Sequence, residues 1–117
     1  MEMELKNLPV IDWKLGMRLA GNKEDLAQDI LQLLVKSLPE DKTSIKQSFI
    51  TKNYKDLLRQ VHKLHGALCY CGTPRLKNVI ASLETGLKNN IMTDLPTLLD
   101  QFETEVNLLL EHYSLLK

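Results

Sequence analysis

The chain has 117 residues, 44% of them hydrophobic and 26% charged, which is the size and composition of one globular domain with its own core. Its 15 basic side chains balance 15 acidic ones, which argues against nucleic acid as a partner, because binding a phosphate backbone normally requires a positive excess. No apolar run approaches the roughly 20 residues that cross a bilayer, and the start MEMELKN lacks the layout of a signal peptide, so we expect a cytoplasmic chain without membrane contact.

Apolar residues recur at three- and four-residue spacing almost throughout, which is typical of amphipathic helices and predicts an all-α chain. We expect residues 1–8 to form a flexible N-terminal segment or linker and residues 9–117 to form the domain. A short first helix is predicted over residues 12–19, ended by Gly21-Asn22, with Trp13 buried as a core plug.

A single apolar stripe beginning at residue 23 or 24 predicts a long second helix. Pro39 removes a backbone donor and clashes with the preceding turn, so we expect a kink or a restart there. The stripe residues expected to face the core are Leu26, Ile30, Leu33, Leu34, Leu38, Ile45 and Phe49.

Asn53 is predicted to cap a third helix, which Gly72 ends. Its core positions follow the alternating three- and four-residue spacing of a bundle seam. These positions are Tyr54, Leu57, Val61, Leu64, Leu68 and Cys71.

Thr73 followed by Pro74 has the pattern of an N-cap with proline at the first helical position, and predicts a fourth helix that Asn89-Asn90 closes. A fifth helix is predicted to begin at residues 93–96. Short connections make successive helices antiparallel neighbours, so the predicted fold is an up-down antiparallel four-helix bundle with an additional short N-terminal helix. The inward positions are Leu76, Val79 or Ile80, Leu83 and Leu87, and then Leu98, Leu99, Phe102, Val106, Leu109, Leu110, Tyr113 and Leu116.

The stretch VHKLHGALCYCGTPR, residues 61–75, holds two of the three histidines and both cysteines. At about 100° per residue, His62 lies about 130° from the inward direction of the third helix and His65 about 70°, so His62 is expected to face solvent and His65 to lie at the boundary. The residue that normally covers His62 is the one four places later, which is Gly66. A mid-helix glycine costs about 1 kcal/mol relative to alanine, and we interpret this one as leaving His62 open to a large partner.

Other interpretations of this stretch compete with that one. Most exposed histidines have no function, and helix geometry alone leaves the question open. A zinc site of His62, His65, Cys69 and Cys71 has suitable ligand types but an unsuitable spacing, because Cys71 falls on the opposite flank from the others. A Cys-x-Cys pair is neither an unstrained disulfide nor a Cys-x-x-Cys redox motif. We therefore predict no metal site, and interpret the cysteines as packing residues and His112 as a surface or boundary histidine.

The order His62-Lys63-Leu64-His65-Gly66-Ala67, then Gly72, Leu76 and Leu83-Glu84, resembles the motif of the histidine-containing phosphotransfer (HPt) domain family. That motif runs H-x-L-K-G-S/A, followed by a glycine six positions on and a leucine-rich helix that ends in Leu-Glu. More narrowly, HKLHG followed by Tyr-x-Gly-x-Pro-Arg is similar to the C-terminal HPt domain of BarA-type hybrid sensor histidine kinases.

The resemblance implies a phosphorelay intermediate of a bacterial two-component system, without autokinase activity of its own. His62 would accept a phosphoryl group from the aspartyl phosphate of a receiver domain and pass it to an aspartate of a response regulator. The implied partners are receiver domains, one of which can belong to the same hybrid kinase. They would supply the Mg²⁺, so this monomeric domain needs no cofactor of its own. If the chain is a fragment of a kinase, an inner-membrane anchor elsewhere in that kinase is compatible with this domain being cytoplasmic.

The resemblance also implies roles for residues around His62. His65 stands where the family has lysine and is expected to stabilise the phosphoryl group, with a charge that depends on pH near neutrality. Arg59, Lys63 and Gly66 are expected to face the receiver, the two basic residues meeting its acidic rim. Two alternatives remain open: a helical adaptor that binds a receiver without accepting phosphate, and a small metal-binding bundle.

Overall fold

A computed structural model describes residues 5–116 of the chain. In these residues there is one short 3-10 helix and five α-helices, and no strand. In chain order they are η1 (Leu5–Asn7), α1 (Trp13–Leu19), α2 (Glu24–Ile50), α3 (Tyr54–Leu68), α4 (Pro74–Lys88) and α5 (Leu95–Leu115).

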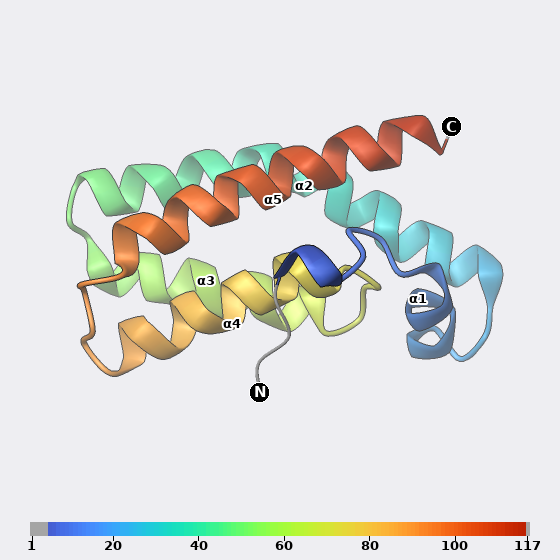
Figure 1. The fold of residues 1–117 in the computed structure, drawn as a ribbon, viewed down its shortest axis with the longest axis horizontal. Helices are drawn as coiled ribbons and strands as arrows, with labels where there is room; N and C mark the ends of the chain where they lie inside the picture. The colour runs from blue at the N-terminus through green and yellow to red at the C-terminus, as the bar shows by residue number, and fades with distance from the viewer. Residues whose placement is uncertain (1–4, 117) are drawn as a thin grey trace.

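The four long helices form an antiparallel bundle. Figure 1 shows α2 and α5 along one side of the molecule and α3 and α4 along the other, with α1 beside the N-terminal end of α2. Each long helix packs against two others, α2 and α4 both lying against α3 and α5. The predicted all-α, up-down four-helix bundle with an additional short N-terminal helix is confirmed.

The predicted N-terminal segment, residues 1–8, falls only partly within the described residues, because residues 1–4 lie outside them. Residues 5–7 form η1, which packs against α4, and Leu5 contacts the main hydrophobic core. The position of a boundary between linker and domain stays a prediction.

Pro39 lies inside α2, which continues through it as one helix. Figure 1 shows that the N-terminal part of α2 is inclined to the rest, as expected where proline removes a backbone hydrogen bond. Side chains on both sides of Pro39 bond to helix carbonyls: Ser37 Oγ donates to Leu34 O, and Thr43 Oγ1 donates to Pro39 O, both at 3.1 Å.

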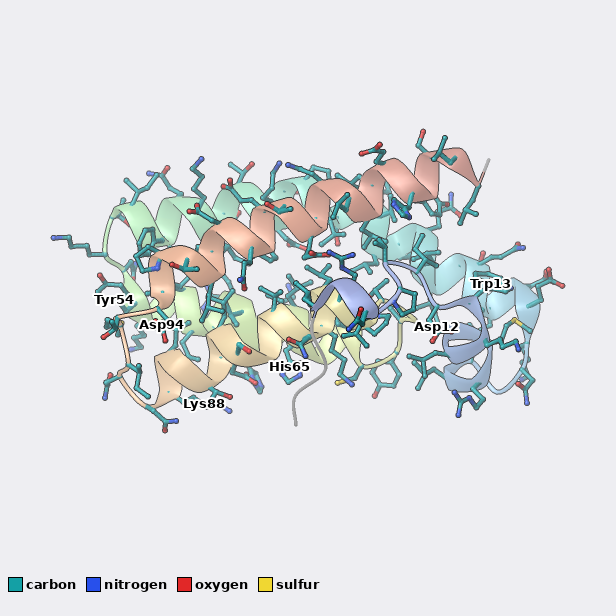
Figure 2. All side chains as sticks on the ribbon, viewed as in Figure 1. Asp12, Trp13, Tyr54, His65, Lys88 and Asp94 are labelled. Atoms are coloured by element: carbon teal, nitrogen blue, oxygen red, sulfur yellow. The ribbon has the colours of Figure 1, made fainter. Side chains whose placement is uncertain are left out.

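Part of the predicted core is wrong at the end of the bundle where α1 lies. There the N-terminal part of α2 extends beyond α3 and α4 in Figure 1, so these two helices do not cover all of its apolar stripe. Figure 2 places Trp13 at this end, where its side chain reaches solvent instead of plugging the core. The residues predicted to be buried that are exposed at this end are Trp13, Leu26, Leu33 and Leu116. Tyr54, the first residue of α3, is also exposed, at the opposite end of the bundle (Figure 2).

The helix ends largely follow the predicted signals. Gly21, Asn22 and Asn90 adopt positive φ at the expected positions, and Asn53 Oδ1 accepts a hydrogen bond from the Asp56 amide at 3.2 Å. Thr73 takes the N-cap position of α4 without bonding to its first turn through the side chain. The third helix is shorter than predicted, since α3 ends at Leu68 rather than beside Gly72.

Residues 71–73, between α3 and α4, are buried against the start of α1. The Asp12 amide donates to Gly72 O at 2.7 Å, and Asp12 Oδ1 accepts from the Leu15 amide at 3.0 Å, so one residue holds the turn and caps α1. A Cβ at position 72 would lie 2.2 Å from Asp12 O and 2.6 Å from Gly16 N. Glycine at 72 is required by this close approach of two backbones.

A buried ion pair joins α4 to α5. Arg75 Nη2 lies 2.7 Å from Glu105 Oε2, and the Glu105 side chain is almost fully buried. This pair spans the antiparallel contact between the two helices near the turn that begins α4.

Replacing Gly72 with alanine is therefore expected to lower the free energy of unfolding by about 1–3 kcal/mol, because the turn and α1 must separate to admit the methyl group. Urea denaturation followed by circular dichroism measures this. Gly66→Ala is the matched control: its Cβ would meet no atom within 4 Å, and removing a mid-helix glycine should raise stability by up to about 1 kcal/mol. Equal denaturation midpoints for the two variants would show that the turn accepts a side chain at position 72.

Candidate functional site

α3 turns one face to the core and another to solvent. Its buried face carries Leu57, Val61, Leu64 and Leu68. The side chain of His62 is 70% exposed and that of His65 is 26% exposed. These positions confirm the outward and boundary bearings predicted from helix geometry.

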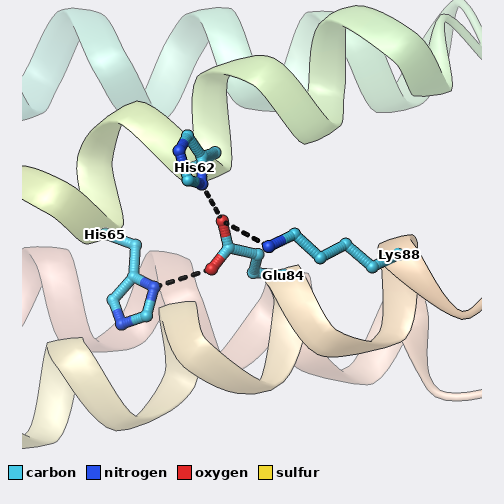
Figure 3. Close-up of polar contacts among 4 residues, drawn as sticks. All are labelled: His62, His65, Glu84 and Lys88. Carbon is cyan, nitrogen blue, oxygen red and sulfur yellow. Dashed lines mark hydrogen bonds and ion pairs between the residues drawn. The ribbon is translucent and has the colours of Figure 1, made fainter.

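The two histidines meet one carboxylate, that of Glu84 on α4 (Figure 3). His62 Nδ1 is hydrogen-bonded to Glu84 Oε2, and His65 Nδ1 lies 2.8 Å from Glu84 Oε1. Lys88, one turn further along α4, places Nζ 3.8 Å from Oε2. Four side chains from two helices therefore form one polar cluster, centred on Glu84.

The Glu84 side chain is largely buried, with 10% of its surface exposed. Burial raises the pKa of this carboxyl group, but the hydrogen bonds from His65 and His62 and the charge of Lys88 oppose burial and hold the pKa below its usual value. Glu84 is therefore an ionised hydrogen-bond acceptor at neutral pH.

An ionised carboxylate can only accept hydrogen bonds, so the nitrogen that faces Glu84 on each histidine carries a hydrogen. In a neutral imidazole with hydrogen on Nδ1, the lone pair is on Nε2. Figure 3 shows the second ring nitrogen of both histidines directed away from Glu84. For His62 this leaves Nε2 as an exposed nucleophilic atom on a rigid helix.

Arg59 and Lys63 lie on the other flank of α3, where they line a groove of about 670 Å³ between α2 and α3. Arg59 Nη2 is 3.6 Å from Asp56 Oδ1, an exposed contact that constrains the guanidinium little. Gly66 is exposed beside this surface, and the packing of the chain does not require a glycine there. The predicted partner-facing residues are thus all accessible.

The cysteines do not join the histidine cluster. Cys71 is buried, its Sγ donates to Ala67 O at 3.5 Å, and burial raises the pKa of its thiol to about 11. Such a thiol remains protonated near neutral pH, which disfavours it as a nucleophile or metal ligand. Cys69 is exposed, so its interpretation as a packing residue is wrong. Within residues 5–116 no three His, Cys, Asp or Glu side chains are grouped as a metal site would require.

Glu84 and Lys88 were not among the predicted site residues. Glu84 belongs to the Leu-Glu pair that ends the family motif, and this was the one signal in the sequence that could have identified it. Lys88 follows at the helical spacing of four residues, which places it beside Glu84 on the same face of α4.

Among the described residues, no helix has both the length and the apolarity that a membrane span requires.

The sequence and fold match known proteins over most of the chain. The profile of the Hpt domain family matches residues 29–112. The signal transduction histidine-protein kinase BarA of Escherichia coli K12 is 36% identical over 98 residues, which is 80% of this chain and 11% of that protein. The sensor protein GacS of Pseudomonas syringae pv. syringae is 41% identical over 81 residues, which is 69% of this chain and 9% of that protein. The chain thus spans about a tenth of the length of these relatives.

A solved structure agrees with these sequence matches. The crystal structure of the HPT domain from a sensor hybrid histidine kinase of Shewanella has a TM-score of 0.74 and 28% sequence identity to this chain. The match covers 95% of this chain and 97% of that domain, so it includes the helices that carry His62 and Glu84. The chain belongs to the Hpt domain family.

Proposed function

We propose that the chain is a phosphorelay intermediate, which accepts a phosphoryl group on His62 from a receiver aspartyl phosphate and passes it to the aspartate of a response regulator. The observation that supports this most directly is the exposed His62 Nε2, held in its nucleophilic tautomer by Glu84. The similarity to BarA and GacS supports a place in a two-component system.

In the proposed transfer, the lone pair of His62 Nε2 attacks the phosphorus atom of the aspartyl phosphate. The new N–P bond forms as the P–O bond breaks, and the aspartate leaves as a carboxylate. The imidazole gains a positive charge while its Nδ1 hydrogen stays bonded to Glu84, whose negative charge stabilises the product. Transfer to a second receiver reverses these steps. The receiver supplies the Mg²⁺ and the acidic residues around the phosphoryl group.

His65 is proposed to support the phosphoryl group by acting through Glu84. Its Nδ1 bonds to the carboxylate, and Figure 3 shows the rest of the ring directed away from His62. His65 thereby helps to orient the group that orients His62. It is a positioning residue in this arrangement, whereas the family lysine at this position would place a permanent charge there.

The receiver is proposed to dock over the groove between α2 and α3. The groove is continuous with the exposed surface of α3 and combines the basic side chains Arg59 and Lys63 with two exposed apolar side chains. These are Leu33, 68% exposed, and Tyr70, 65% exposed. Such a surface fits a partner helix with an apolar face beside an acidic rim. A receiver bound through such a helix would bring its phosphorylated aspartate toward His62.

Replacing His62 with glutamine removes the proposed nucleophile at an exposed position, so the fold should persist while phosphoryl transfer is lost. The measurement is incubation with a radiolabelled phosphorylated receiver, followed by a test for acid-labile, base-stable label on the chain. His112→Gln, at an exposed histidine on α5, is the matched control and should keep wild-type transfer. Undiminished label on the His62→Gln variant would refute the proposal. A wild-type chain that binds the receiver and acquires no label would favour the adaptor.

Replacing His65 with lysine should retain transfer and flatten its pH dependence between about pH 6 and 8, because lysine keeps its charge across the range where histidine titrates. Rates of label transfer measured across this range test the idea. His112→Lys adds the same charge at a distant exposed position, and this variant should show the same pH dependence of transfer as the wild type. Indistinguishable profiles for the His65→Lys variant and the wild type would contradict this prediction.

Replacing Leu33 with glutamate places a negative charge in the proposed docking groove and should weaken binding of the receiver about tenfold. Binding is measured by calorimetry in the His62→Gln background, so that transfer does not interfere. Leu115→Glu makes the same change at an α5 side chain that is 79% exposed and should bind normally. Equal affinities for the two variants would place the receiver elsewhere.

A further inference from the structure

The cluster around Glu84 presents two imidazoles in the same chemical arrangement, although the proposed relay uses only one of them. His62 and His65 each face one oxygen of the same carboxylate through Nδ1. Both therefore carry a lone pair on Nε2 in the neutral form, because the hydrogen is fixed on the other nitrogen. The property that makes His62 a nucleophile is thus also present in His65.

Accessibility separates the two histidines. The His62 side chain is 70% exposed, which suits a receiver that must surround the reacting atoms, whereas the His65 side chain is 26% exposed. A partly exposed ring excludes a folded domain more strongly than it excludes a small molecule. By the same helix geometry that places Gly66 over His62, the residue that leans over His65 is Cys69, a small and exposed side chain.

We propose that His65 is a second phosphoacceptor, which takes a phosphoryl group on Nε2 from small phosphoryl donors and not from receiver domains. The donors are small molecules with a good leaving group on phosphorus, namely phosphoramidates and acyl phosphates. The inference depends on the histidine geometry and does not require that His62 act in a relay.

The transfer is balanced with either class of donor. The lone pair of His65 Nε2 forms the new N–P bond. With phosphoramidate the donor P–N bond breaks and ammonia leaves with the hydrogens it already carries. With an acyl phosphate the P–O bond breaks and a carboxylate leaves. In both cases the Nδ1 hydrogen stays on the bond to Glu84, which compensates the positive charge of the phosphorylated ring.

His112 is an internal control that separates the effect of a fixed ring tautomer from the effect of side-chain exposure. His112 on α5 is more accessible than His65, and within the described residues no hydrogen bond or ion pair fixes its ring. If exposure alone decided reactivity, His112 would react faster. If fixing the tautomer decides it, His65 reacts faster despite being partly covered.

The experiment treats the His62→Gln variant with potassium phosphoramidate and, separately, with acetyl phosphate. Mass spectrometry under alkaline conditions maps the phosphate, and phosphorus NMR identifies the ring nitrogen that carries it. We expect label on Nε2 of His65 in excess of label on His112. Adding His65→Gln should abolish this label, and adding His112→Gln should leave it unchanged. Label at His65 from either donor supports the proposal and identifies the leaving group.

Adding Glu84→Gln to the same background tests the positioning of His65. It should slow labelling about tenfold, through loss of a charge-assisted hydrogen bond, and should let part of the phosphate appear on Nδ1. A merely structural role of Glu84 would not change which nitrogen reacts. Circular dichroism of each variant verifies the fold.

The proposal is overturned if neither donor labels His65, or if His112 is labelled as fast. Labelling of His65 in the His62→Gln variant by a phosphorylated receiver would overturn the part that excludes receivers. These outcomes are distinct from failure of the proposed relay, which is judged by receiver-dependent label on His62 in the wild-type chain.

Discussion

The contact between Gly72 and the start of α1 controls the geometry of the functional site. Gly72 bonds through its carbonyl to the Asp12 amide, and its missing Cβ lets the backbone approach Gly16. This buries residues 71–73 and fixes the point at which the chain reverses between α3 and α4. An antiparallel helix pair has no freedom of register once its turn is fixed, so Glu84 comes to lie opposite His62 and His65. Inserting or deleting one residue in the turn would rotate Glu84 about the axis of α4 by about 100°, away from both rings.

Glu84 also illustrates how a buried charge is used. A carboxylate removed from water is unfavourable unless hydrogen-bonded partners replace the solvent, and here two imidazoles donate hydrogen bonds while the ammonium group of Lys88, at 3.8 Å, contributes its charge. The requirement acts in both directions: the partners keep Glu84 ionised, and the ionised carboxylate fixes the hydrogen on the inner nitrogen of each ring. Orientation of the two imidazoles therefore follows from satisfying a buried charge, and the proposed transfer needs no enclosed pocket.

Much of this arrangement follows from the sequence because helix periodicity is local. The spacing of apolar residues in the third helix was sufficient to place His62 outward and His65 at the boundary, and the asparagines marked helix ends correctly. The role of Glu84 could not be derived in this way, since it depends on the register between two helices, which buried backbone contacts at Gly72 determine. The exposure of Trp13 and Leu33 had a similar origin: an apolar stripe indicates which face of a helix seeks cover, but not where the neighbouring helices stop.

The two flanks of α3 differ in their electrostatic surroundings. On the flank toward α4, Glu84 sets the protonation of the rings and its negative charge faces the imidazole that would become a cation. On the flank toward α2, Arg59 and Lys63 border an apolar groove whose lining has one acidic side chain, Asp41 of α2. A second negative group beside the proposed docking groove would offset both basic side chains, whereas a negative group behind His62 would stabilise the charge of a phosphorylated ring. Because α3 separates Glu84 from this groove, the carboxylate that orients the histidines does not weaken the basic rim of the proposed docking surface.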